Sequence, residues 1–416
     1  MLARVITLGC KVNEYESQSI MNQLRQNGYE VEEGLGMADI YVVNTCAVTN
    51  IAERKSRQTI TKILKLNENA KIVVVGCASQ NNPGQFLKSK NVLALTGNAG
   101  KNDIMKFINS CNKVLPDLEH FKFEDTARPI ETRTRQYIKI QDGCDYFCSY
   151  CLIPYVRGRS RSRDMNDILD EISNTKANEI VLTGINMSDY KQNNERALKQ
   201  LVREIDKLGK RFRISSIECM VLDEEMIDIL KNCKNFCPHF HLSLQSACNE
   251  TLKRMNRHYN IEQFKEIVSN IRKVFDNPCI STDVIVGFKG ETDTEFEDTY
   301  NNLRDIKFDF MHIFPYSERA GTVAARLPNA VDSCVVKERE GRLIELNINN
   351  RNDFFNRNTS TVHKVLIEEV DQNMSLGYTD NYIYTYIDGV YEIGSIVEVE
   401  LQKPYILGMK GKIKES

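Results

Sequence analysis

The sequence predicts an α/β protein in three parts: an N-terminal α/β domain with a parallel sheet, an open partial (βα)6 barrel, and a small all-β barrel at the C-terminal end. Three patterns lead to this prediction. Apolar runs alternate with helically spaced segments over residues 1–100. Six further strand candidates alternate with amphipathic helices from 135 to about 320, and short strands separated by Gly and Asn turns follow from about 361.

The N-terminal domain is predicted over residues 1–114. Buried strands are expected at 4–9, 40–44 and 71–76, because each is a short and mostly apolar run. Helices are expected at 13–27 and 51–66, where apolar residues such as Ile20 and Leu24 recur at helical spacing. The repeated order of strand and helix indicates a parallel sheet.

The barrel is predicted over 135–358, after a polar linker at 115–134 that contains two prolines. Its strands are expected at 136–141, 179–183, 211–217, 239–244, 279–286 and 310–315. Six strands are too few to close an eight-stranded barrel, so we expect an open one. A long charged helix at 332–358 should end this part, and the all-β module should occupy 361–416.

The composition is that of an ordinary globular protein, with 41% hydrophobic and 27% charged residues among 416. No apolar run approaches the roughly 18 residues of a membrane span, and MLARVITLGC lacks the features of a signal peptide. We therefore expect a cytoplasmic protein with no membrane partner. The net charge of -2 argues against a surface coated in nucleic acid but leaves room for a local basic patch.

Cysteines follow all three predicted N-terminal strands. Cys10 comes after VITLG, Cys46 after IYVVNT and Cys77 after KIVVVG. The carboxyl ends of parallel strands share one edge of a sheet, so these three thiols should gather in space. The alternative is three unrelated buried cysteines, because Cys is often a core residue.

A second group, Cys144-x3-Cys148-x2-Cys151, follows the first strand of the barrel. Three thiolates on one loop are typical of an iron–sulfur cluster, and three ligands leave one iron open to a substrate. A structural zinc site would be the alternative, but it needs four ligands and no fourth partner lies nearby in sequence. Tyr150, just before the third cysteine, suits packing against an adenine.

The segment from Cys144 to Cys151 resembles the signature of the radical S-adenosylmethionine superfamily. The segments 7–17 (TLGCKVNEYES), 43–49 (VNTCAVT) and 75–77 (VGC) resemble the methylthiotransferase family within it. The resemblance covers the whole chain, including a C-terminal module like the TRAM domain. GCKVN, residues 9–13, is similar to the MtaB-like branch, which acts on threonylcarbamoyladenosine beside the tRNA anticodon, whereas the isopentenyladenosine branch more often has Gln-Met at Lys11-Val12.

The resemblance implies two [4Fe-4S] clusters and S-adenosylmethionine as both methyl donor and radical source. Cys144, Cys148 and Cys151 would be catalytic, through a cluster that cleaves S-adenosylmethionine to a 5′-deoxyadenosyl radical. Cys10, Cys46 and Cys77 would hold an auxiliary cluster that carries the transferred sulfur. The radical would take hydrogen from C2 of the adenine at position 37, and a methylthio group would replace it. The reductant would be an external donor such as a flavodoxin or ferredoxin, and the substrate the tRNA anticodon loop.

Polar or Gly residues end the barrel strands, where the active sites of barrels collect. As cofactor-binding residues we expect Gly184, Asn186, Glu218, Gln245, Arg257 and Tyr150. In the family an Arg of the segment 252–257 helps hold the S-adenosylmethionine carboxylate. A planar guanidinium suits a carboxylate, and Arg257 is preferred over Arg254.

Four arginines in seven residues, Arg157, Arg159, Arg161 and Arg163, follow the cluster loop and are expected to contact RNA phosphates. A solvated basic loop is the alternative. The C-terminal module does not fit an RNA-binding role as simply, because residues 361–416 hold five Lys, no Arg and nine Asp or Glu.

Three other functions remain open at this point. A family member could act on isopentenyladenosine of tRNA or on an aspartate of a ribosomal protein. A two-cluster electron-transfer protein would explain the cysteines without any substrate chemistry.

Overall fold

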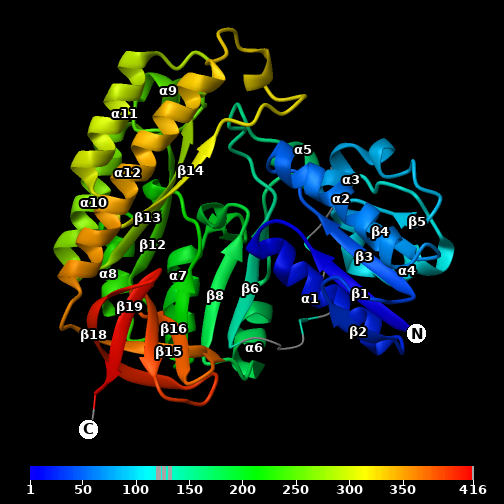
Figure 1. Cartoon of the computed structure of the whole chain (residues 1–416), viewed down its shortest axis with the longest axis horizontal. Coiled ribbons are helices and arrows are strands. Elements are labelled where there is room, and N and C mark those ends of the chain that lie inside the picture. Colours follow the sequence, from blue (N-terminus) through cyan, green and yellow to red (C-terminus); the bar gives the residue numbers. More distant parts are fainter. Residues whose placement is uncertain (119–122, 124–127, 130–133, 415–416) are drawn as a thin grey trace.

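The computed structural model describes residues 1–118, 123, 128–129 and 134–414 (Figure 1). Most of the predicted linker at 115–134 therefore lies outside the described residues. The rest forms an N-terminal parallel sheet with helices on both faces, a barrel-like curved sheet, and a closed β-barrel at the C-terminal end. The predicted fold class is confirmed.

The N-terminal sheet has five parallel strands, against three in the prediction. In spatial order they are β2 (Glu30–Glu33), β1 (Leu2–Thr7), β3 (Ile40–Thr45), β4 (Lys71–Gly76) and β5 (Val92–Leu95). The three predicted strands are the central ones. The two edge strands have only four residues each. β2 is mostly charged and exposed and lacks the pattern of a buried strand, whereas β5 is apolar and mostly buried but short.

Helices cover both faces of this sheet. On one face lie α1 (Lys11–Gln26) and α4 (Ile104–Ser110), which share a core with Val5, Val42 and Val73. On the other lie α2 (Asn50–Leu66) and α3 (Cys77–Asn81), whose core includes Val43 and Val74. The alternation of Val42 and Val43, and of Val73 and Val74, between two cores explains why these strands are apolar throughout. The 3-10 turns η1 (Pro83–Gln85) and η2 (Ala99–Asp103) complete this part.

The barrel has the six predicted parallel strands in two groups. The first has the order β11 (Arg211–Ile214), β8 (Glu179–Gly184), β6 (Arg135–Asp142), with the short antiparallel β7 (Arg161–Ser162) at its edge. The second has the order β12 (His239–Gln245), β13 (Cys279–Val286), β14 (Phe310–Pro315). A parallel bridge between Ile217 and Leu242 joins the groups. No pairing is found between β6 and β14 among the described strands, so the barrel is open as expected.

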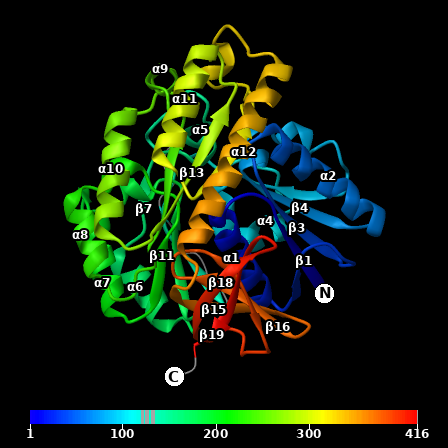
Figure 2. The ribbon, with the colours of Figure 1, turned by 60° about the vertical axis from the view of Figure 1, so that its left-hand side comes forward.

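The barrel helices lie on the outer face, over one large hydrophobic core (Figure 2). They are α6 (Met165–Asn174), α7 (Leu198–Lys207), α8 (Glu224–Asn232), α9 (Asn249–Arg254), α10 (Ile261–Val274), α11 (Asp293–Ile306) and α12 (Ser333–Arg357). Capping boxes at Asn260 and Thr292 start α10 and α11. The smaller elements are α5 (Ile153–Arg157), the hairpin β9 (Lys191–Gln192) and β10 (Glu195–Arg196), and the turns η3 (Met187–Asp189), η4 (Cys219–Val221) and η5 (Ala324–Arg326).

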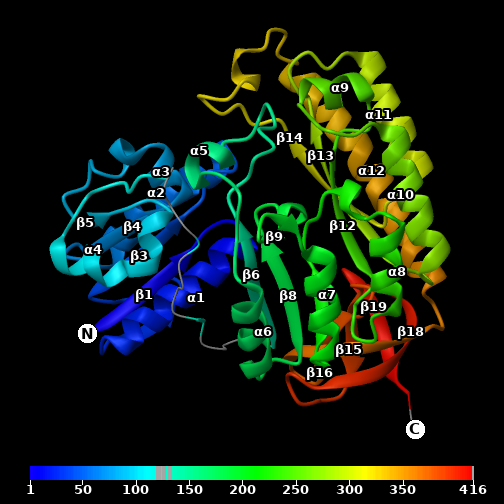
Figure 3. The same ribbon diagram turned by 180° about the vertical axis from the view of Figure 1, so that it is seen from behind.

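The C-terminal module is a closed barrel of β15 (Val362–Asp371), β16 (Met374–Thr379), β17 (Tyr384–Asp388), β19 (Gly408–Ile413) and β18 (Ile396–Tyr405), in that spatial order. It lies at the amino ends of the larger barrel's strands (Figure 3). Arg211, the first residue of β11, donates to the carbonyls of Lys364 and Tyr378. The module therefore sits at the opposite end of the strands from the predicted active site. None of the described helices is long and apolar enough to cross a membrane.

Candidate active site

The cysteines Cys10, Cys46 and Cys77 lie just beyond the carboxyl ends of β1, β3 and β4, as predicted. Cys46 and Cys77 are buried and Cys10 is exposed. Gly9 has a positive φ of 111°, and a Cβ there would lie 2.9 Å from Cys46 Sγ, so this glycine lets the Cys10 loop approach Cys46. Burial raises the pKa of Cys46 to about 12, with smaller contributions from the charges of Cys77 and Cys10. The three sulfurs therefore share one site.

The second triad occupies the loop between β6 and α5. Backbone N–H groups point at two of its sulfurs: Tyr146 N lies 3.4 Å from Cys144 Sγ, and Ile153 N lies 3.4 Å from Cys151 Sγ. Arg257 Nη1 lies 3.2 Å from Cys148 Sγ. Burial raises the pKa of Cys144 to about 11 and that of Cys151 to about 12. Such thiols lose their protons when a cationic group is bound to them.

Among the described residues, the sulfurs of neither triad lie as close together as three ligands of a single metal ion do. Three ligands of one zinc ion at about 2.3 Å would lie about 3.8 Å from one another. Among the described residues, neither cysteine triad has all its sulfurs within 4.8 Å of one another. The N–H groups aimed at Cys144 and Cys151 are also of the kind that tune iron–sulfur clusters. The residues present therefore fit a cluster in each triad.

The two triads share a wall made by α5. This helix begins two residues after Cys151, and Leu152 and Val156 belong to the same hydrophobic core as Cys77. Asn98 joins the two sides, because its Nδ2 lies 2.7 Å from the carbonyl oxygen of Val156 and 3.4 Å from Cys77 Sγ. The position of one triad is therefore fixed relative to the other by packing as well as by hydrogen bonds.

A buried network of charges reinforces this junction. Arg157 Nη1 donates to Glu16 at 2.8 Å and to Asp142 at 3.0 Å, and its Nη2 donates to Asn13 at 2.7 Å. Lys139 Nζ lies 2.7 Å from Glu16 and 2.8 Å from Asp142. Despite desolvation, the neighbouring cations hold the pKa of both Glu16 and Asp142 below their usual values. The network ties α1, which follows Cys10, to β6, which leads to Cys144.

The predicted RNA contacts of the arginine segment need correction. Arg157 is completely buried, and Arg163 is buried against Tyr15, Asp167 and Glu171. Arg161 Nη2 is held by Asp142 at 2.9 Å. These three side chains balance buried acids and are not open to phosphates. Arg159 differs, because its side chain is 71% exposed and its guanidinium lies 4.6 Å from the Phe147 ring centre.

Arg257, preferred from the sequence, lies at the second triad. It donates to Cys148, to the carboxylate of Glu218 and to the carbonyl of Ser243. Arg254 instead forms a two-pronged pair with Glu295, with both N–O distances at 2.7 Å. Arg257 and Glu218 therefore lie at the cluster loop, whereas the Arg254 guanidinium is occupied by Glu295.

The other expected cofactor residues also lie around this loop. The backbone N–H of Asn186 donates a hydrogen bond to Gln141 Oε1 at 2.7 Å, and Asn186 Nδ2 lies 3.9 Å from Cys144 Sγ. A Cβ on Gly184 would lie 3.2 Å from the Gln141 carbonyl oxygen, so the backbone is close-packed there. Gln245 ends β12 with a positive φ of 72°. Tyr150 packs edge-on against Phe288, with ring centres 6.3 Å apart.

Lys11 is a site residue whose role the sequence did not reveal. Its side chain is exposed, and no hydrogen bond or ion pair of Lys11 is found within the described part of the chain. Desolvation by the surrounding protein lowers the pKa of Lys11 to about 8, repulsion from Arg135 and Arg213 lowers it further, and attraction from Asp283 opposes the shift. These three residues belong to β6, β11 and β13, so the charges that act on Lys11 come from the barrel strands. Asp283 there groups with His241 and His312, with ligand atoms within 4.8 Å of one another.

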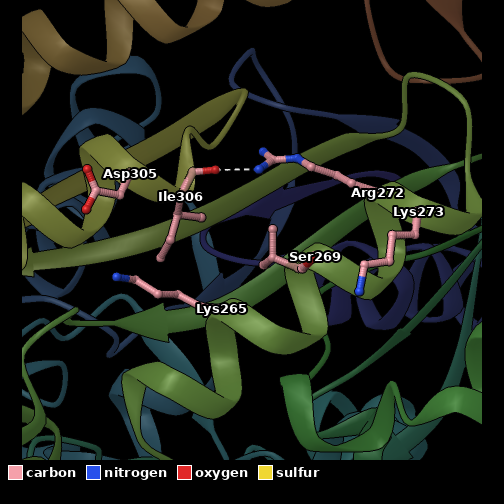
Figure 4. Close-up of a pocket in the computed structure, with 7 residues that line it drawn as sticks. Lys265, Ser269, Arg272, Lys273, Asp305 and Ile306 are labelled. Atoms are coloured by element: carbon pink, nitrogen blue, oxygen red, sulfur yellow. Dashed lines mark hydrogen bonds between the residues drawn. The ribbon is translucent and has the colours of Figure 1, made fainter.

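A separate pocket lies on the outer surface, between α10 and the end of α11 (Figure 4). Lys265, Ser269 and Arg272 line it, and Arg272 donates to the carbonyl of Ile306. It is formed by the helices that cover the barrel and contains none of the cysteines, so it is not part of the site described above.

The comparisons with known proteins agree with this geometry. The radical SAM superfamily matches residues 138–303, and the family described as uncharacterized protein family UPF0004 matches residues 3–97. The threonylcarbamoyladenosine tRNA methylthiotransferase MtaB of Bacillus subtilis is 36% identical over 434 residues, which cover 98% of this chain and 96% of that protein. The tRNA-2-methylthio-N(6)-dimethylallyladenosine synthase of Natranaerobius thermophilus is 31% identical over 437 residues, covering 99% and 96%.

A solved structure shows the same fold at low identity. The radical S-adenosylmethionine methyltransferase TsrM from Kitasatospora setae has a TM-score of 0.55 and 14% identity, and the match covers 76% of this chain and 74% of that one. The cofactors of the family are S-adenosylmethionine and two [4Fe-4S] clusters. By its similarity over nearly the whole chain, this protein belongs to the tRNA methylthiotransferase family of radical S-adenosylmethionine enzymes.

Proposed function

We propose that this enzyme converts N6-threonylcarbamoyladenosine at position 37, beside the tRNA anticodon, to its 2-methylthio derivative. The observation that carries the proposal is the pair of cysteine triads, one beyond the strands of each sheet, joined through α5. The relatives named for threonylcarbamoyladenosine support this substrate. Membership of an enzyme family argues against an electron-transfer protein.

Each part of the chain has a role in this proposal. Residues 1–114 hold the auxiliary cluster, 115–134 link the parts, 135–358 carry the radical chemistry, and 361–416 form a TRAM-like module. When bound, the cluster on Cys144, Cys148 and Cys151 supplies the electron that cleaves S-adenosylmethionine, and the cluster on Cys10, Cys46 and Cys77 supplies the sulfur. An external flavodoxin or ferredoxin provides the electron, and the reaction takes place in the cytoplasm, on the anticodon loop.

The protein's own side chains would position S-adenosylmethionine. Arg257 lies beside Cys148, and its guanidinium suits the methionine carboxylate. Glu218 orients Arg257 and offers a carboxylate to the methionine amine, next to Asn186 and Gly184. Tyr150 and Gln245 would border the adenosine end.

Lys11 favours threonylcarbamoyladenosine over isopentenyladenosine. The threonylcarbamoyl group ends in a carboxylate, whereas the isopentenyl group is apolar. Lys11 follows Cys10 in the chain, and the charges of Arg135 and Arg213 act on it. Both arginines already pair with Glu179. A substrate carboxylate would form a charge-assisted hydrogen bond with the ammonium group of Lys11. An apolar group would offer no hydrogen-bond acceptor to that ammonium group.

The test is an anaerobic reaction of the reconstituted protein with S-adenosylmethionine, a reductant and tRNA that carries threonylcarbamoyladenosine. We expect 5′-deoxyadenosine and the 2-methylthio nucleoside, detected by mass spectrometry of the digested tRNA. A parallel reaction uses tRNA that carries isopentenyladenosine. Product from the second tRNA alone would overturn the substrate assignment, and absence of 5′-deoxyadenosine in both would overturn the radical reaction.

A further inference from the structure

Helix α2 concentrates positive charge on one surface. Its exposed side chains include five cations, which are Arg54, Lys55, Arg57, Lys62 and Lys65. The only acid in the helix, Glu53, is buried and paired with Arg319. Ile60 and Ile63 are buried against the sheet, so the cations point outward. A chain with a net charge of -2 thus carries a 17-residue helix whose outer face is strongly basic.

This cationic face is held next to the active site. Helix α2 begins four residues after Cys46, with Thr49 as its N-cap. Asn50, its first residue, donates from its backbone N to Ser317 Oγ at 3.1 Å and from Nδ2 to the Glu318 carbonyl at 2.9 Å, in the loop that follows β14. The helix is therefore tied both to the auxiliary triad and to the rim of the barrel.

The surroundings of α2 suit an RNA strand. Arg57 donates to Gln85 at 2.6 Å, and Gln85 donates to Glu53 at 2.6 Å, so the Arg57 guanidinium is oriented while its other donors stay open. Large apolar side chains are exposed beside the helix and around the site: Val48 at 60%, Ile51 at 55% and Tyr155 at 53%. Single-stranded RNA is bound by cations for the phosphates and by apolar or aromatic surfaces for splayed bases.

We propose that the exposed face of α2, comprising Arg54, Lys55, Arg57, Lys62 and Lys65, binds the phosphate backbone of the tRNA anticodon arm, with Arg159 contacting it nearer the active site. This inference rests on the proposed function. From Arg54 to Lys65 the helix rises about 16 Å, enough to follow several successive phosphates. The first exposed acid beyond this face is Glu68, after the helix ends.

The C-terminal barrel differs from α2 in its charge and in its place in the molecule. It carries a net negative charge and lies at the other end of the molecule from α2 and α5 (Figure 1). The charge of α2 therefore has the sign that phosphate contacts require, and the net charge of the C-terminal barrel does not.

The test compares two triple variants of the full-length protein with the same loss of charge. One is Arg54→Gln, Lys55→Gln, Lys62→Gln on α2, and the control is Lys403→Gln, Lys412→Gln, Lys414→Gln on the C-terminal barrel, where all three are exposed. Binding of a fluorescent anticodon stem-loop RNA is measured by anisotropy from 0.05 to about 0.5 M salt, a range over which phosphate contacts weaken steeply. Circular dichroism verifies that each variant is folded.

The α2 variant should bind about 100-fold more weakly at low salt, and its plot of log affinity against log salt should be shallower by about 2 to 3, as for the loss of three phosphate contacts. The control should stay close to wild type. A conservative variant, Arg54→Lys with Arg57→Lys, should also bind nearly as wild type, because it keeps the charge.

Two other outcomes separate the two proposals. If wild type binds the RNA and the α2 variant binds as tightly, or the control loses as much, the assignment of α2 is overturned and the proposed function stands. If wild type fails to bind the RNA even at low salt, the proposed function is overturned together with it.

Discussion

Arg157 donates hydrogen bonds from both terminal nitrogens to the Glu16 carboxylate, with Nη1–Oε1 at 2.8 Å and Nη2–Oε2 at 3.1 Å. The two residues are 141 positions apart in the chain. Glu16 belongs to the helix that begins after Cys10, and Arg157 ends the helix that follows Cys151. The pair therefore holds together the segments that carry the two cysteine triads.

Removing one partner of this pair should destabilise the protein strongly. Arg157→Ala would leave Glu16 buried without its main cation and would take one of its cations from the buried Asp142, at a cost of about 3–5 kcal/mol in the free energy of unfolding. Urea unfolding of the cluster-free protein measures this. Arg159→Ala is the matched control, because that side chain is 71% exposed and should cost no more than about 0.5 kcal/mol. Equal effects of the two changes would contradict the structural role of Arg157.

The same network predicts a loss of stability in acid. Neighbouring cations hold the pKa of Glu16 and of Asp142 below the values of 4.5 and 3.8 that they have when unfolded. The stability that these carboxylates contribute is therefore complete above about pH 4.5 and declines as the pH falls through their lowered folded values. The unfolding free energy of wild type, minus that of Glu16→Gln, should be constant from pH 7 to 5 and smaller at pH 3. If this difference in unfolding free energy were larger at pH 3 than at pH 7, the predicted direction of the pH dependence would be wrong.

The sequence predicted the parts of this molecule that depend on local pattern. The three central N-terminal strands, the six barrel strands and the strand-end positions of Cys10, Cys46 and Cys77 follow from apolar runs and their ends. The predicted RNA contacts of Arg157, Arg161 and Arg163 were wrong because the sequence does not show which acids these arginines pair with. Their partners Glu16 and Glu171 come from other parts of the fold, and a charge on a loop does not reveal whether a distant acid will cover it.

The basic outer face of α2 can be predicted from the sequence alone. Its helical spacing separates five outward cations from the buried Ile60 and Ile63, and this pattern can be read from residues 50–66 alone. Lys11 was visible only as part of a motif. The charges that act on it, those of Arg135, Arg213 and Asp283, come from barrel strands far from it in the sequence.

Arg257 and Arg254 should differ sharply in their effect on S-adenosylmethionine binding. Arg257→Ala removes the guanidinium beside Cys148, and we expect the Kd for S-adenosylmethionine to rise about 10- to 100-fold, as for a lost charge-assisted hydrogen bond. Arg254→Ala removes the partner of Glu295 and should leave this Kd within a factor of about three. The Kd for S-adenosylmethionine is measured by equilibrium binding to each reconstituted variant under nitrogen. A larger effect from Arg254 would show that the wrong arginine was assigned.

Cys46 and Cys148 should separate the two halves of the reaction. Cys46→Ala should lose about half of the bound iron and sulfide and form no methylthio nucleoside, while 5′-deoxyadenosine is still produced. Cys148→Ala should lose a similar share of the iron and form neither product. An iron assay measures the cluster content of each variant, and mass spectrometry measures its 5′-deoxyadenosine and its methylthio nucleoside. Methylthio product from Cys46→Ala would mean that the N-terminal triad does not supply the sulfur.

Lys11 provides the sharpest test of the substrate, because it is the group that a threonyl carboxylate would meet. Lys11→Gln keeps most of the side-chain length and removes the charge, so kcat/KM for tRNA with threonylcarbamoyladenosine should fall about 10- to 100-fold. Lys412→Gln is the control, since it makes the same chemical change on the C-terminal barrel and should have little effect on kcat/KM. Because Lys11 adjoins Cys10, the iron content of the variant is measured as well. A fall in kcat/KM with full iron content supports the carboxylate contact, whereas unchanged kinetics would remove Lys11 from the substrate site.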